Sequence, residues 1–194
     1  MRGVPNLLTV LRIAAIPVIG VLIADPTPAR SWAAMFVFLA ASLTDALDGW
    51  IARRYGLVTT LGKLLDPLAD KLLVLSTLLL LATLPREPNI PGWLLVIVVG
   101  REFAVTGLRS IAAAEGLVLG AEATGKAKML LQVVGVHFLL VHRPVLGFSA
   151  HQIGIVLLVM GAAVGVWSAV SYHVQAFRLL RPPAAGGRAE GRGA

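Results

Sequence analysis

The sequence predicts an all-α, polytopic membrane protein with six transmembrane helices. Three observations support this fold class. Hydrophobic residues make up 57% of the 194 residues and charged residues only 14%, whereas an average soluble domain is about 45–50% apolar and about 25% charged. The apolar residues run through nearly the whole chain. Six spans of about 20 residues each fit into this length when the loops are short.

Six apolar stretches can be marked, and each is interpreted as one transmembrane helix. Clusters of Pro, Gly and charged residues separate them, as at 25–28, 85–91 and Arg143-Pro144. The fifth stretch is short for a span unless its helix begins near Glu122 with polar residues at the membrane rim. The stretches cover approximately residues 7–23, 32–51, 64–84, 93–114, 127–141 and 153–177.

The basic residues predict the orientation of the chain. With six spans, both termini lie on one side of the membrane, and of the seventeen Lys and Arg residues only Arg30, Arg86 and Arg143 fall on the other side. The positive-inside bias therefore places both termini in the cytoplasm. The same bias explains the net charge of +7 without a nucleic-acid partner.

The chain is expected to form a single domain followed by a short tail. Residues 1–181 would make the six-helix catalytic domain, and residues 182–194, rich in Pro, Gly, Ala and Arg, a disordered basic tail. The sequence contains no cysteine, which excludes disulfides and thiolate catalysis.

Four of the ten acidic residues lie close together in the sequence, namely Asp45, Asp48, Asp66 and Asp70. The first two are three residues apart and the last two are four apart, so each pair shares one face of its helix. A turn near Tyr55 would join the two helices as a hairpin and bring the four carboxylates together near the cytoplasmic rim.

Unpaired, the four carboxylates could not all stay ionised. Oxygen ligands favour Mg²⁺, Mn²⁺ or Ca²⁺ over Zn²⁺, and four carboxylates can bridge two ions about 3.5–4 Å apart, an arrangement used in phosphoryl chemistry.

Residues beside the acids fit a phosphate ligand. Gly49 lets a ligand approach the backbone, Arg53 can bind phosphate oxygens through two hydrogen bonds, and Gly62 opens the next segment. Taken singly, each has a structural alternative, the glycines as helix-packing positions and Arg53 as an anchor at the rim.

Together these residues read Asp45-x2-Asp48-Gly49-x2-Ala52-Arg53-x8-Gly62-x3-Asp66-x3-Asp70. This pattern resembles the signature of the CDP-alcohol phosphatidyltransferases, a family with a six-helix membrane fold, at every fixed position and gap. The resemblance implies a metal-dependent transfer of a phosphatidyl group from a CDP-linked lipid to an alcohol, with release of CMP. It implies that Asp45, Asp48 and Asp66 hold two ions, Mg²⁺ or Mn²⁺, and that Asp70 also reaches a metal and is the general base.

The resemblance also implies where the CDP-linked lipid binds. Gly49 and Arg53 would contact the CDP moiety and Thr59 its diphosphate, and the segment 5–9 resembles, more weakly, the nucleotide-side segment of the family. The expected CDP-lipid-binding residues are Asn6, Thr9, Gly49, Arg53, Thr59 and Gly62.

Cations in the fourth and fifth stretches predict a site for a phosphorylated acceptor. Arg101 and Arg109 are eight residues apart and lie near one helix face, and Lys126 and Lys128 begin the fifth stretch. Facing the acids, these four would form an anion site. Alternatively they are charges of the cytoplasmic rim, and Glu102 simply pairs with a neighbouring cation.

Five segments resemble the phosphatidylglycerophosphate synthase branch of the family. Three lie in the fourth and fifth stretches, Gly100-Arg101-Glu102, Thr106-Gly107-Leu108-Arg109 and Gly125-Lys126-x-Lys128, and the other two are Pro5-Asn6-Leu7-Leu8-Thr9-x2-Arg12 and Leu65-Asp66-Pro67-Leu68-Ala69-Asp70-Lys71. This similarity implies CDP-diacylglycerol and sn-glycerol 3-phosphate as substrates and phosphatidylglycerophosphate as product. It implies that Arg101, Arg109, Lys126 and Lys128 bind the acceptor phosphate. We also expect a homodimer in the bacterial cytoplasmic membrane, with the active site on the cytoplasmic side.

Other functions remain open at this point. Within the family, the alternatives are a phosphatidylinositol-phosphate synthase or a cardiolipin synthase of the same fold. A small cation transporter would also need intramembrane acids, but distributed along a path through the membrane. A purely structural helix bundle would use Gly161-x3-Gly165, a small-residue pattern that supports packing within one chain or dimerisation.

Overall fold

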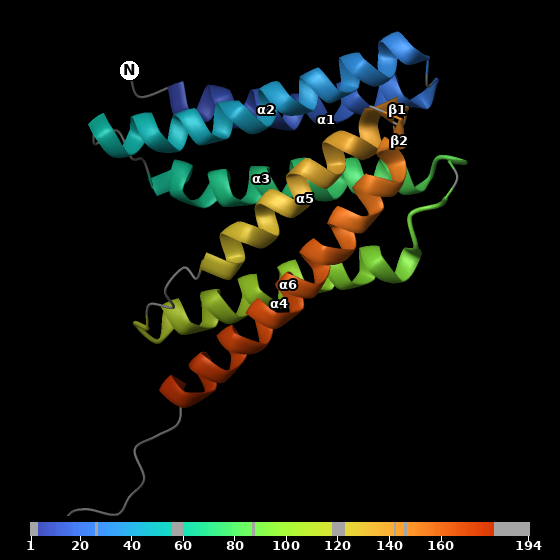
Figure 1. Ribbon diagram of the computed structural model, residues 1–194. Coiled ribbons are helices and arrows are strands. Elements are labelled where there is room, and N and C mark those ends of the chain that lie inside the picture. The colour runs from blue at the N-terminus through green and yellow to red at the C-terminus, as the bar shows by residue number, and fades with distance from the viewer. Residues whose placement is uncertain are drawn as a thin grey trace, which may run out of the picture.

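A computed structural model shows six long helices joined by short connections (Figure 1). It describes the backbone of residues 4–25, 27–55, 60–86, 88–117, 123–141, 143–145 and 147–180. Side chains are described over the same ranges except for residues 4–9, 45–55, 60–70, 123, 145 and 178–180. The predicted tail, residues 182–194, lies outside the described residues. The helices are α1 (Val4–Ala24), α2 (Pro28–Tyr55), α3 (Thr60–Ala82), α4 (Gly92–Ala114), α5 (Ala123–Val141) and α6 (Ala150–Leu180).

Each helix corresponds to one of the six apolar stretches, so the predicted number and order of helices are confirmed for the described residues. The helix ends differ in detail. Because polar turns extend beyond the apolar segments, α2 and α6 are longer than predicted, whereas α3 ends at Ala82, two residues before the predicted end. The fifth helix begins at Ala123, one residue after Glu122, as its short apolar stretch requires for a span.

Local sequence signals explain where helices begin and end. Pro28 is the first residue of α2, a position where its missing N–H costs no hydrogen bond. Thr27 precedes it and accepts a hydrogen bond on Oγ1 from the backbone N–H of Arg30, at 3.3 Å. At the end of α4, Gly116 has a positive φ of 73°. Its N–H donates to the carbonyl of Ala113, and the N–H of Leu117 donates to that of Ala112. This pair of bonds is a Schellman motif, which satisfies the last carbonyls of the helix.

A short β-hairpin joins α5 to α6 and was not predicted from the sequence. Strand β1 (Pro144–Val145) pairs antiparallel with β2 (Phe148–Ser149), with Val145 opposite Phe148. Gly147 adopts a φ of 83° in the turn, a conformation that glycine reaches without steric cost. The apolar pattern gave no signal here because each strand is only two residues long.

The helices alternate in direction, so their connections fall at two ends of the molecule. The first residues of α1, α3 and α5 and the last residues of α2, α4 and α6 lie toward one end, which is called the site end below (Figure 1). The opposite end carries the α1–α2, α3–α4 and α5–α6 connections. The predicted hairpin of the second and third helices is present, with α2 ending at Tyr55 and α3 beginning at Thr60.

The hydrophobic core runs along the bundle and draws on all six helices. Ile19 of α1, Phe38 of α2 and Leu158 of α6 are fully buried in it. The ring of Phe38 meets that of His137 edge to face, with centroids 5.0 Å apart, and His137 Nδ1 lies 2.7 Å from the carbonyl oxygen of Val133. His137 therefore packs against the core and bonds within its own helix.

Helices α5 and α6 pack closely because glycines remove side chains between them. A Cβ at Gly154 would lie 2.7 Å from Leu139 Cγ and 2.9 Å from the carbonyl oxygen of Gly135. Gly161 and Gly165 face α5 in the same way. The small-residue pattern of α6 therefore serves packing within the chain, and it gives the predicted homodimer no support.

Arg86 is a buried cation at the opposite end, in the α3–α4 connection. Its Nη1 donates to the carbonyl oxygen of Leu139 at 2.9 Å, in the last turn of α5. This contact satisfies a carbonyl that the helix leaves free and places positive charge at the negative end of the helix dipole. Arg86 thus ties the α3–α4 connection to the end of α5.

Two helical segments are long and apolar enough to cross a membrane, by length and composition alone, within the part of the chain that the structure describes. They are Thr124–Val141 and Ala150–Phe177, while the apolar parts Val10–Ala24 and Lys71–Ala82 are shorter. Many large apolar side chains are nevertheless exposed on the outer faces of the bundle, among them Val21, Phe36, Val96, Phe103 and Trp167.

We expect Gly154→Ala to destabilise the protein, because the added methyl group meets the Gly135 backbone and cannot be relieved by a rotamer change alone. The expected loss is about 1–3 kcal/mol in the free energy of unfolding, measured by thermal unfolding in detergent micelles. Gly92→Ala is the matched control, since a Cβ there meets nothing within 4 Å. Equal stability of the two variants would contradict the proposed tight contact.

Candidate active site

The four predicted metal-binding aspartates are carried by the two helices that meet at the site end. Asp45 and Asp48 lie in the last turns of α2, and Asp66 and Asp70 lie in the first half of α3. Their side chains are outside the described residues, so the convergence of the carboxylates stays a prediction. The described backbone places both pairs in helices, as their spacing predicted, and these two helices follow one another in the chain.

The predicted CDP-lipid-binding residues lie in the same region of the backbone. Gly49 and Arg53 belong to α2, Gly62 to α3, and Asn6 and Thr9 to the first turns of α1. The side chains of these residues are outside the described set, and Thr59 lies wholly outside the described residues. Their roles therefore remain predictions.

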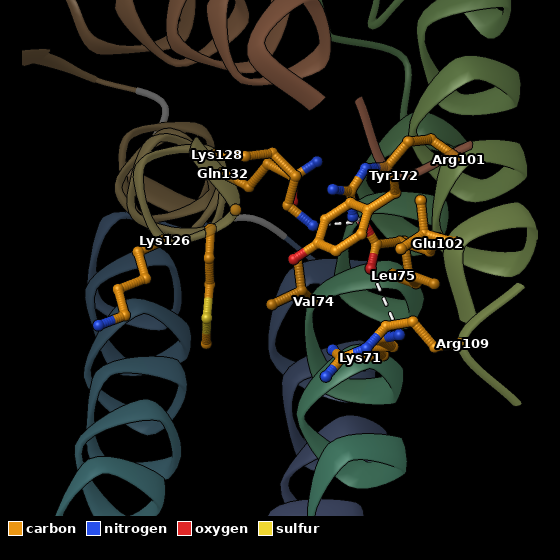
Figure 2. Close-up of a pocket in the computed structure, with 13 residues that line it drawn as sticks. Lys71, Val74, Leu75, Arg101, Glu102, Arg109, Lys126, Lys128, Gln132 and Tyr172 are labelled. Carbon is orange, nitrogen blue, oxygen red and sulfur yellow. Dashed lines mark hydrogen bonds and ion pairs between the residues drawn. The ribbon is translucent and has the colours of Figure 1, made fainter. Parts of the chain in front are cut away.

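A cavity of about 240 Å³ lies beside α3 at the site end, enclosed by α3, α4, α5 and α6 (Figure 2). All four predicted acceptor-binding cations line it. Five cations and one acid face this volume, so it is called the cationic cavity. These charged residues are Lys71, Arg101, Glu102, Arg109, Lys126 and Lys128.

Glu102 is the centre of the charge network in the cationic cavity. Its Oε1 accepts from Arg101 Nη1 at 2.8 Å and also from Lys128 Nζ, and its Oε2 lies 3.6 Å from Lys71 Nζ. The side chains of Glu102, Lys128 and Arg101 are only 7%, 8% and 10% exposed. A buried ion needs partners to offset its desolvation, and here one carboxylate serves three cations.

Helix α6 holds Arg101 independently of Glu102. Arg101 Nε donates to the carbonyl oxygen of Gly165 at 3.0 Å, and Nη2 donates to Ser168 Oγ at 3.2 Å. The missing side chain of Gly165 leaves room for the stem of Lys128, since a Cβ there would lie 3.2 Å from both Cγ and Cδ of that lysine. Arg101 is thus fixed by three polar partners on two helices.

Lys71 connects the cationic cavity to the aspartate helix. It follows Asp70 directly in α3, and its Nζ donates to Thr106 Oγ1 of α4. Thr106 Oγ1 in turn donates to the carbonyl oxygen of Glu102, at 2.6 Å. The cavity therefore begins one residue after the predicted general base.

Arg109 and Lys126 differ from the other cations because both are exposed. Among the described side chains, neither takes part in an ion pair. In Figure 2, Lys126 extends away from Glu102, whereas Lys128 and Glu102 point toward one another. Arg109 and Lys126 are thus available to an anion, while Arg101 and Lys128 already have a carboxylate partner.

The expected pairing of Glu102 with a neighbouring cation is confirmed, but sequence reasoning did not place Glu102 in the cavity. It also did not place Lys71 or the buried Gln132 and Tyr172 there. Glu102 carried a usable signal, because an acid inside an apolar stretch is functional by default. The other three gave none, since their position depends on which faces of α3, α5 and α6 meet. Among the described side chains, no group of three or more His, Asp and Glu residues is placed to hold a metal ion.

Comparison with known proteins identifies the class to which this fold and cavity belong. The sequence pattern of the CDP-alcohol phosphatidyltransferases matches residues 2–167. The chain therefore belongs to the CDP-alcohol phosphatidyltransferase family, which is generally dependent on divalent metal ions.

Curated relatives point to a narrower group. The chain is 35% identical to the CDP-diacylglycerol–glycerol-3-phosphate 3-phosphatidyltransferase of Bacillus subtilis (strain 168), over 92% of this chain and 98% of the relative. It is 39% identical to the enzyme of the same name from Rickettsia bellii (strain RML369-C), over 71% of this chain and 75% of the relative. It is also 37% identical to a cardiolipin synthase (CMP-forming) from Oryza sativa subsp. japonica, over 91% of this chain but only 58% of the relative.

We expect inorganic phosphate to raise the unfolding temperature of the protein, because the cationic cavity carries more positive than negative charge and an anion that binds the folded state stabilises it. Arg109→Gln should reduce this shift by half or more, since it removes an exposed cation of the cavity. The measurement is thermal unfolding in detergent micelles over a phosphate series. Arg143→Gln is the matched control, an exposed arginine at the opposite end. The assignment fails if both variants respond to phosphate as the wild type does.

Proposed function

We propose that this protein transfers the phosphatidyl group of CDP-diacylglycerol to sn-glycerol 3-phosphate, giving phosphatidylglycerophosphate and CMP. The observation that carries the proposal is the similarity to a curated enzyme of this activity over nearly the full length of both chains. The cationic cavity supports it from the structural side, because it lies next to Asp70 and suits a small anionic acceptor.

The metal chemistry is assigned to the four aspartates. Their donor set consists only of carboxylate oxygens, which fits Mg²⁺ or Mn²⁺, and their placement on the joined ends of α2 and α3 fits a shared site for two ions. When bound, the ions would neutralise the diphosphate and the leaving CMP. Gly49 and Arg53 would hold the CDP moiety beside them.

The reaction then depends on the placement of the acceptor. Asp70 would take the proton from the hydroxyl of glycerol 3-phosphate as this oxygen attacks the β-phosphorus of the CDP-lipid. The bond from that phosphorus to the bridging oxygen breaks, and CMP leaves with the electron pair. Arg109 and Lys126 would hold the acceptor phosphate in front of the paired cations Arg101 and Lys128. This arrangement converts an encounter of two substrates into a reaction at fixed geometry.

The charge of the cavity favours a phosphomonoester over a lipid acceptor. A phosphomonoester carries a charge of about −1.5 to −2 at neutral pH, whereas the phosphodiester of phosphatidylglycerol, the acceptor of a cardiolipin synthase, carries a single charge. Five cations against one acid match the higher charge. An inositol phosphate is also a phosphomonoester, so charge does not separate it from glycerol phosphate.

Membrane placement belongs to the same proposal. We infer six spans with both termini and the site end in the cytoplasm of a bacterium, and the diacyl chains of the CDP-lipid remaining in the bilayer. The exposed apolar side chains on the outer faces support this inference, because a protein in water rarely exposes so many. The alternation of helix direction supports it as well, since it gathers the basic helix ends on one side. The homodimer remains a prediction.

The choice of acceptor is tested by measuring CMP release. Purified protein is incubated with CDP-diacylglycerol, Mg²⁺ and, in separate reactions, sn-glycerol 3-phosphate, inositol phosphate or phosphatidylglycerol. We expect release with glycerol phosphate and its loss when the metal is chelated. Release only with phosphatidylglycerol would identify a cardiolipin synthase, and release only with inositol phosphate the other branch. No release of CMP with any acceptor would overturn the proposed transfer reaction.

Asp70→Asn should lower kcat by about 10²–10⁴-fold, because the amide cannot accept the proton of the attacking hydroxyl. The measurement is CMP release at saturating concentrations of both substrates. Asp25→Asn is the matched control, since Asp25 is exposed at the opposite end and pairs with Arg30. Full activity of Asp70→Asn would remove this residue as the base.

A further inference from the structure

The described lining of the cationic cavity contains one acid, and this acid touches three of its five cations. A lone carboxylate in a site for an anionic substrate is unexpected on charge grounds, because it repels the ligand. It is also costly to bury, since Glu102 has a side chain that is only 7% exposed. Its contacts indicate what it does instead.

We propose that Glu102 is a positioning residue of the acceptor site, whose carboxylate holds Lys71 and Lys128 so that the cavity presents a fixed array of positive charge to the acceptor phosphate. This inference rests on the proposed function, and it gives Glu102 a role that neither the resemblance of the Gly100-Arg101-Glu102 segment nor the names of the relatives assign. Glu102 itself would not touch the acceptor.

The two lysines depend on Glu102 more than Arg101 does. Arg101 is also held by Gly165 and Ser168 of α6, so its guanidinium would stay in place without Glu102. The ammonium of Lys128 is bonded to Glu102, and its stem packs against Gly165. Without the carboxylate, a buried ammonium would lie next to the Arg101 guanidinium with no anion between them, and the repulsion would drive it from its position.

Lys71 is held in a similar way on the other oxygen of the same carboxylate. Its Nζ lies 3.6 Å from Glu102 Oε2 and donates to Thr106 Oγ1. Lys71 follows Asp70 in α3, so this contact lies at the boundary between the acceptor cavity and the predicted catalytic carboxylates. Glu102 thus links α3, α4 and α5 through its two oxygens.

A simpler view of Glu102 makes the opposite prediction. If the carboxylate only lowered the charge of the cavity, then its neutralisation would leave five unopposed cations and would tighten the binding of phosphate. If it positions the lysines, neutralisation disorders the array and weakens the binding. The sign of the change in affinity therefore separates the two views.

The test uses the purified full-length protein in detergent micelles and the variant Glu102→Gln. We expect the dissociation constant of inorganic phosphate, measured by calorimetry, and the KM of sn-glycerol 3-phosphate to rise about tenfold to a hundredfold, the range expected when one hydrogen bond to a charged group is lost. The KM of CDP-diacylglycerol should not change. Glu115→Gln is the matched control, an exposed glutamate at the end of the same helix, and it should leave all three constants as in the wild type.

The outcomes distinguish this inference from the proposed function. Tighter or unchanged phosphate binding in Glu102→Gln overturns the positioning role, and so does an equal loss of affinity for both substrates, which indicates general damage. If the wild type binds phosphate but releases no CMP, the proposed function fails, and the calorimetric comparison still decides the role of Glu102. A wild type that binds no phosphate overturns the inference.

A second variant covers the case in which Glu102→Gln does not fold. Glu102→Asp keeps the charge but withdraws the carboxylate by one methylene from Lys128. It should weaken phosphate binding in the same acceptor-specific way, with a smaller change. Binding equal to that of the wild type would show that the position of the carboxylate is unimportant and would overturn the proposal.

Discussion

The close packing of α5 against α6 is the contact on which the cationic cavity depends. Gly135 and Gly154 let the two backbones approach, and Gly165 leaves room for the stem of Lys128. The approach brings Lys128 of α5 and the Gly165 carbonyl of α6 to the same side of α4, where Glu102 and Arg101 lie. A larger residue at Gly135 or Gly154 would separate the helices and open the network, because a Cβ there meets a backbone oxygen of the other helix, which cannot move aside as a flexible side chain does.

Charges inside an apolar bundle impose the second constraint. Each buried cation of the cavity has a specific partner, with Glu102 shared among Lys71, Arg101 and Lys128. The partners come from four different helices, so the network also holds the bundle together at the site end. Cations that need no such support, Arg109 and Lys126, are the exposed ones. The paired cations are held by Glu102 and the exposed ones are available to an anion. The site can therefore be rich in cations although only some of them face the substrate.

Much of the fold was predictable from the sequence because its signals are local. Apolar stretches of span length gave the six helices, Pro28 and Gly116 mark helix ends by their own backbone chemistry, and the spacing of the four aspartates placed them on two joined helices. The β-hairpin at 144–149 was not predicted, because two-residue strands are too short to show the alternation of apolar and polar residues that indicates a strand. Gly161-x3-Gly165 was ambiguous for a different reason: a small-residue stripe specifies close packing but does not name the partner helix.

The sequence by itself determined the class of chemistry, the helices and the two sets of charged residues, since residue type and spacing along a helix need no knowledge of distant contacts. It also placed Arg101, Arg109, Lys126 and Lys128 in one site. Only the tertiary structure decided which of those cations are buried and paired and which are exposed. It also decided that Lys71 and Glu102 line the same cavity. The rotation of α4, α5 and α6 about their axes sets these pairings. Packing among residues far apart in the chain sets this rotation, and the residue pattern within one helix does not specify such contacts.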